Sequence, residues 1–77
     1  MNRVGQVIQM DGTGQTTCLI VGRRDYESGW DDLWEWEIVV LDHMPTGAHV
    51  GDPPVHKPGD RMSLNNQYIE KYSVSVT

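Results

Sequence analysis

The amino-acid sequence predicts an all-β protein, a small five-stranded barrel with one long irregular loop. Runs of β-branched and apolar residues are separated by short segments rich in glycine, asparagine and aspartate, and no stretch repeats its apolar residues with a helical period. At 77 residues the chain has room for one hydrophobic core, so a single domain over residues 1–77 is expected. A barrel is favoured because closure leaves no exposed sheet edge in so short a chain.

The first two strands are expected at residues 4–10 and 16–21. The turn between them is Asp11–Gly14, "DGTG", whose two glycines are typical of a hairpin. The second strand, "TTCLIV", is apolar on both faces, which predicts burial on much of both sides. Cys18 within it is interpreted as a buried thiol, and as the only cysteine it excludes an internal disulfide.

The third strand, Leu33–Leu41, has the clearest alternation in the chain. Because strand residues point to opposite faces in turn, Glu35 and Glu37 fall on one face. The other face is apolar, and we expect it to form the core: Trp34, Trp36, Ile38 and Val40.

The rest of the chain is expected to be less regular. Prolines and glycines predict a long loop over His43–Gly59, with a short edge strand near Ala48–Val50. A short strand should follow at Arg61–Leu64, with Met62 and Leu64 on one face. After a turn at Asn65–Asn66, alternation from Tyr68 to Val76 predicts a final strand.

This order of elements resembles SH3-like barrels: a hairpin, a polar loop after the second strand, a tryptophan-bearing third strand and the turn "PGD" at Pro58–Asp60. Phages and mobile elements encode several small proteins of this kind. The resemblance covers the chain as a pattern of strands, although the loop over His43–Gly59 is longer than such barrels usually have. An oligonucleotide-binding (OB-like) barrel is the alternative fold.

The net charge is −5, and the acidic residues gather between Asp25 and Asp42. This charge disfavours general attraction to nucleic acid, since such binding depends on lysine and arginine neutralising phosphates. It favours a basic partner, and a DNA-mimic inhibitor is a further alternative. No signal sequence or membrane-spanning run precedes the strands, so a cytoplasmic location and no contact with a membrane are expected.

The leading functional hypothesis is a non-catalytic protein-interaction or assembly module. In SH3-type domains aromatic side chains receive proline-rich peptides and neighbouring acids receive a basic residue. By analogy, the loop over residues 25–32 should bind a basic or proline-rich protein partner through Tyr26, Glu27, Trp30, Asp31 and Asp32. The segment around His43–His56 is a second candidate surface. The uncharged end of the chain, "SVSVT", favours a homo-oligomer formed through sheet edges.

The sequence leaves two other function classes as alternatives. A nucleic-acid-binding barrel would use the basic residues Arg23, Arg24, Lys57 and Arg61. An enzyme would need a pocket in which Cys18 or a histidine meets a carboxylate, and no catalytic residue or cofactor is assigned. The histidines are six and seven residues apart, wider than the pairs usual in zinc sites, so they are expected to face solvent from a loop without metal: His43, His49 and His56.

Overall fold

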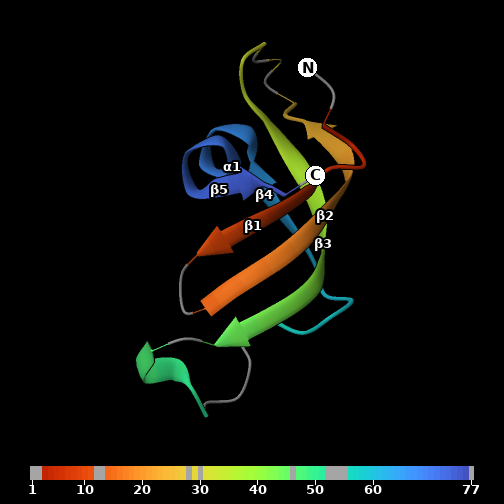
Figure 1. Cartoon of the computed structure of the whole chain (residues 1–77). Helices are drawn as coiled ribbons and strands as arrows, with labels where there is room; N and C mark the ends of the chain where they lie inside the picture. The colour runs from red at the N-terminus through yellow and green to blue at the C-terminus, as the bar shows by residue number, and fades with distance from the viewer. Residues whose placement is uncertain are drawn as a thin grey trace.

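A computed structural model describes residues 3–11, 14–27, 29, 31–45, 47–51 and 56–76. It contains one antiparallel sheet of five strands in the order β4-β3-β2-β1-β5, together with one short α-helix (Figure 1). The elements in chain order are β1 (Val7–Asp11), β2 (Gly14–Asp25), β3 (Trp34–Pro45), the 3-10 helix η1 (Gly47–His49), β4 (Arg61–Asn65), α1 (Asn66–Tyr72) and β5 (Ser73–Ser75).

The predicted hairpin and third strand are confirmed. β1 pairs with β2 from Val7↔Leu19 to Asp11↔Gln15, as expected for strands joined by the "DGTG" turn. β2 and β3 are longer than predicted and form the most extensive strand pair of the sheet. β2 continues through Arg23 and Arg24 to Asp25, and β3 continues to Pro45. The predicted all-β class is therefore confirmed apart from one short helix, α1.

The hydrophobic core lies on one face of the sheet, which we call the core face. The buried residues come from β1, β2, β3 and α1: Ile8, Cys18, Ile20, Trp36, Ile38, Val40 and Ile69. Met62 and Leu64 of β4 pack against them, as does the half-buried Trp34. The predicted apolar face of β3 and the buried thiol are thus confirmed. The prediction that β2 is buried on both sides is wrong for its other face, where Val21 is exposed and Leu19 is half-buried.

Two β-bulges change which side chains reach the core face. Leu41 is an extra residue in β3 between the pairs Thr17↔Asp42 and Cys18↔Val40. Val21 is an extra residue in β2 between Ile20↔Ile38 and Gly22↔Glu37. Each extra residue reverses the alternation beyond it. As a result His43 pairs with Thr16, and Arg23 pairs with Trp36, on the core face.

The predicted final strand over residues 68–76 is wrong in its first half. Residues 66–72 form α1, and only Ser73–Ser75 pair with β1. The helix begins where Asn65 caps it, since the Asn65 Oδ1 atom accepts a hydrogen bond from the Tyr68 amide at 2.6 Å. Only Ile69 of this helix is buried, so the sequence carries no strong helical period.

Two further expectations for the irregular segment are corrected. The predicted edge strand near Ala48–Val50 is replaced by η1, because Gly47 adopts a φ of 59° and opens a 3-10 turn. The loop begins later than His43, since β3 continues to Pro45.

Candidate functional site

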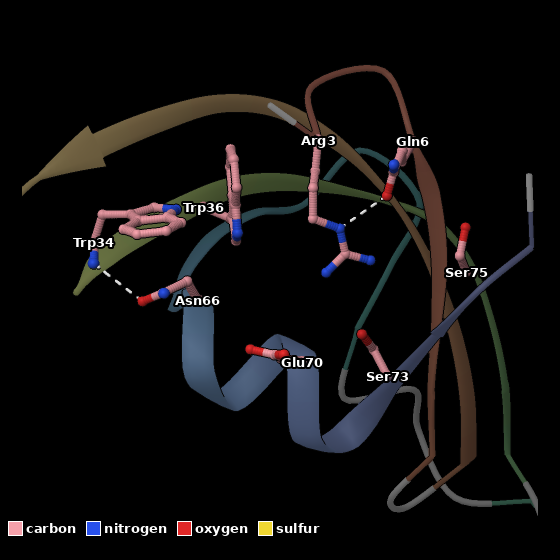
Figure 2. A pocket seen from close by; sticks show the side chains of 8 residues that line it. All are labelled: Arg3, Gln6, Trp34, Trp36, Asn66, Glu70, Ser73 and Ser75. Atoms are coloured by element: carbon pink, nitrogen blue, oxygen red, sulfur yellow. Dashed lines mark hydrogen bonds between the residues drawn. The ribbon is translucent and has the colours of Figure 1, made fainter. Parts of the chain in front are cut away.

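A groove of about 530 Å³ lies between the core face of the sheet and α1 (Figure 2). Its floor is formed by Trp34 and Trp36 of β3. The two walls come from parts of the chain that are far apart in sequence, the N-terminal turn on one side and the helix with β5 on the other. They are lined by Arg3, Gln6, Asn66, Glu70, Ser73 and Ser75. The volume lies within the range of about 300–1,000 Å³ that is usual for ligand sites.

The floor consists of two tryptophan rings at right angles. Their centroids are 5.8 Å apart, in an edge-to-face arrangement. Trp36 is 2% exposed and belongs to the core, whereas Trp34 is half-buried. The Arg23 guanidinium lies 4.0 Å from the centroid of the Trp34 ring, a cation–π contact that holds this ring in place. Within the described residues, the Trp34 Nε1 atom is buried without a hydrogen-bond partner.

The helical wall is fixed by Asn66. Its Oδ1 atom accepts a hydrogen bond from the Trp34 amide at 3.1 Å, and its Nδ2 atom donates to the Asp32 carbonyl oxygen at 3.2 Å. One turn later Glu70 lies on the same side of the helix, because residues four apart share a face. The Ser73 hydroxyl donates to the Ile69 carbonyl oxygen and closes the end of the helix. Glu70 therefore faces the groove from a wall that is anchored at both ends.

The opposite wall is a tight N-terminal turn. The Gly5 amide donates to the Ile20 carbonyl oxygen at 2.8 Å, and the Ile20 amide donates to the Gln6 carbonyl oxygen at 3.0 Å. Gly5 has a φ of 95°, a conformation that a side chain would strain. Arg3 reaches back across this turn, and its Nε atom donates to Gln6 Oε1 at 2.8 Å. Figure 2 shows the guanidinium of Arg3 pointing into the space between the sheet and α1.

The groove therefore combines an aromatic floor with opposite charges on its two walls. Arg3 supplies the positive charge and Glu70 the negative one. Among the described residues, no ion pair joins Arg3 to Glu70. The salt bridge between Arg23 and Asp25, at 2.8 Å, lies outside the groove lining. Such a site can hold an apolar or aromatic group on the floor and orient it by polar contacts on either side.

The structure divides the loop predicted to bind a partner between two places. Asp31 and Asp32 adjoin the groove wall, whereas Tyr26 and Glu27 line a separate hollow together with Arg24 and Glu35. Asp31 and Asp32 are exposed, and the Asp32 carbonyl oxygen is bonded to Asn66 of the groove wall. Glu27 is exposed, whereas Tyr26 is half-buried. Partial burial, a hydrogen bond to Glu35 and the charge of that carboxylate raise the pKa of the Tyr26 hydroxyl. Trp30 lies outside the described residues.

The structure does not bring the four predicted basic residues into one patch. Arg23 lies on the core face, where it covers Trp34 and pairs with Asp25. Arg24 and Arg61 share the other face, but the strand registers place Glu35 and Glu37 between them. Lys57 lies in the turn before β4, where its amide donates to Asp60 Oδ2 at 2.9 Å.

Two of the three histidines, His43 and His56, differ from the predicted arrangement because both are half-buried. His43 is half-buried on β3 rather than solvent-facing in a loop, because the bulge at Leu41 turns it toward Thr16, whose Oγ1 lies 2.8 Å from His43 Nδ1. His56 is half-buried beside it, with ring centroids 5.7 Å apart. Nothing is described for the side chain of His49. Among the described residues, no group of three metal-binding side chains comes together.

Sequence reasoning missed most of the groove. It identified Trp34 and Trp36 as core residues, but it gave no role to Arg3, Gln6 or Glu70. Arg3 precedes the first strand, and the alternation around Glu70 predicts a strand where the structure has a helix. The spacing of four residues between Asn66 and Glu70 would place both side chains on one face of a helix, and this was the sequence feature that could have predicted the helical wall.

Within the part of the chain that the structure describes, no helix is long and apolar enough to cross a membrane.

Comparison with protein-family models, with curated proteins and with solved structures finds no match to this chain.

Proposed function

We propose that this chain is a non-catalytic protein-interaction module that receives an extended segment of a partner protein in the groove between the sheet and α1. The observation that carries the proposal is the groove itself, with Trp34 and Trp36 as its floor and the charged side chains of Arg3 and Glu70 on its walls. Rigid aromatic surfaces flanked by a few polar groups are typical of sites where proteins bind peptides. The exposed Asp31 and Asp32 would form one rim and contact the same partner.

A small SH3-like barrel is the architecture that we propose for this module. The pairing of β5 with β1 supports it, as does α1, which carries the chain from β4 at one sheet edge to β5 at the other. The core face then becomes the interior, and the groove is the opening left between α1 and the N-terminal turn. This placement differs from the loop site expected from the sequence, since the loop forms only the rim.

The proposal is tested by selecting ligands from a displayed library of random peptides. We expect the wild-type chain to select peptides, and their addition to shift the amide and indole NMR signals of Trp34, Trp36 and Glu70. Trp34→Ala should abolish binding, whereas Tyr72→Ala should retain it, because Tyr72 is an exposed aromatic residue of α1 that does not line the groove. Signal changes confined to another surface would contradict the proposal, and because they are measured on the wild-type chain they do not depend on how the variants fold.

Self-association is the second candidate, and the two sheet edges favour it. β5 carries no charged residue; its Val74 is 62% exposed, and Val76, which follows the strand, is 51% exposed. Among the described residues no strand pairs with the outer side of β5 or of β4. Such edges pair readily with another chain, and a lysine on the edge blocks this pairing. Sedimentation velocity should then show an oligomer that dissociates in Val74→Lys, and a wild-type monomer at high concentration would rule this out.

A further inference from the structure

We infer that the groove selects a peptide segment that carries a carboxylate and a basic group side by side, the carboxylate received by Arg3 and the basic group by Glu70. The inference rests on the proposed function, and it adds the chemistry of the ligand and its direction in the groove.

Arg3 is arranged as a receptor for a carboxylate. Its Nε atom is held by Gln6 Oε1 at 2.8 Å in a partly buried hydrogen bond, which fixes the plane of the guanidinium. The turn that carries it is tied to β2 by the hydrogen bonds of Gly5 and Gln6 with Ile20. The two terminal nitrogens then point into the groove (Figure 2). A guanidinium oriented in this way matches the two oxygens of a carboxylate.

Glu70 is arranged as a receptor for a cation on the other wall. An ionised carboxylate only accepts hydrogen bonds, and among the described residues Glu70 forms no ion pair. Asn66 holds the helix against Trp34 and Asp32, so the backbone that carries Glu70 has a fixed position, and the exposed Glu70 side chain lines the groove with the tryptophans. A lysine or arginine side chain can pair with this carboxylate while its charge or its apolar stem lies against an indole ring.

The two walls together exclude ligands that carry only one kind of charge. A segment with only acidic groups would face Glu70 and the exposed acids Asp31 and Asp32. A segment with only basic groups would bring a cation against Arg3. Like charges at close quarters give specificity by repulsion, so the segment that meets neither penalty carries both charges.

Three charge variants, compared with the wild-type chain, test this selection with the same random peptide library. Wild-type ligands should be enriched severalfold in sequences that hold an acid and a base together. Arg3→Glu should select ligands that carry bases and no acid, and Glu70→Lys should select ligands that carry acids and no base. The double variant Arg3→Glu with Glu70→Lys should again select both charges. Each single change should weaken wild-type ligands by about tenfold, since an attractive pair becomes repulsive.

Matched controls come from the other face of the sheet. Glu37 and Arg61 line a separate hollow there, so Glu37→Lys and Arg61→Glu make the same changes of charge without touching the groove. Both controls should select the wild-type ligands. A library displayed with free carboxyl ends, compared with one whose ends are amidated, identifies the carboxylate as a chain terminus or as an aspartate or glutamate side chain.

The outcomes separate the inference from the proposed function. Ligands that require Trp34 but show no charge preference would overturn the inference and leave the proposed function standing. The same holds if Arg3→Glu and Glu70→Lys select the same ligands as the wild-type chain. A selection that yields no Trp34-dependent ligand would overturn the proposed function, and the inference with it.

Discussion

Burial of Cys18 makes the stability of the fold sensitive to alkaline pH. The side chain is fully buried, and the desolvation raises the pKa of its thiol above its ordinary value of 9.0. The unfolded chain therefore loses this proton at lower pH than the folded one does. The stability that the protonated thiol contributes is complete below the unfolded pKa and is lost as pH rises toward the folded pKa.

We expect the free energy of unfolding to fall as pH rises past 9.0, the ordinary pKa of the thiol. The decrease should be smaller in Cys18→Ala, in which only other groups, such as the Tyr26 hydroxyl with its raised pKa, still titrate. Urea denaturation at a series of pH values measures it. The same slope in both proteins would show that the thiol ionises equally well in the folded chain.

The indole nitrogen of Trp34, which has no hydrogen-bond partner among the described residues, allows a second prediction about stability. A buried N–H without an acceptor costs about 1–3 kcal/mol, and the Trp34 Nε1 atom is in this state among the described residues. Trp34→Phe removes the atom and keeps a ring under Arg23. We therefore expect the free energy of unfolding to change by less than about 1 kcal/mol.

The comparison variant for that position is Trp34→Ala, which loses the ring as well. It should cost about 2 kcal/mol or more, because packing against the core and the contact with Arg23 disappear together. Chemical denaturation of the two variants separates the effect of the indole N–H group from the effect of the ring. A large loss of stability in Trp34→Phe would mean that the indole nitrogen has an acceptor in solution.

At the scale of the element, α1 depends on its N-terminal cap. Asn65→Ala removes the acceptor for the Tyr68 amide and should lower the free energy of unfolding by about 1 kcal/mol. Asn65→Asp keeps a side-chain oxygen at this position and should retain most of the stability. Denaturation followed by far-UV circular dichroism measures both, and equal losses in the two variants would contradict the role of the cap.

The same helix shows what the sequence could not settle. The alternation of Tyr68, Glu70 and Tyr72 with their neighbours suits an edge strand. The same residues also suit a helix with a single buried residue, Ile69. The Asn65 cap and the contact between Tyr68 and Tyr72, whose ring centroids are 4.8 Å apart, favour the helix. The cap and the ring contact both depend on how the helix packs in the fold, and the local alternation of residues carries no information about that packing.

The bulges limit prediction in a different way. Alternation placed Trp34, Trp36, Ile38 and Val40 correctly because no extra residue interrupts β3 between them. Beyond Leu41 the alternation reverses, so His43 faces Thr16 instead of solvent. A bulge arises from the pairing of two strands, and one strand's own sequence does not show it.

For the molecule as a whole, the distribution of charge favours a protein partner over nucleic acid. The net charge is −5, Arg23 is held against Trp34 and Asp25, and Glu35 and Glu37 separate Arg24 from Arg61. We therefore expect no binding of single-stranded or duplex oligonucleotides, even at low salt where phosphate contacts are strongest. Tryptophan fluorescence measures such binding, since the chain carries three tryptophans and two of them, Trp34 and Trp36, form the floor of the groove. A saturable change on adding oligonucleotide that disappears as salt rises would contradict this expectation, and loss of that change in Arg24→Glu or Arg61→Glu would locate the phosphate contacts on the face opposite the groove.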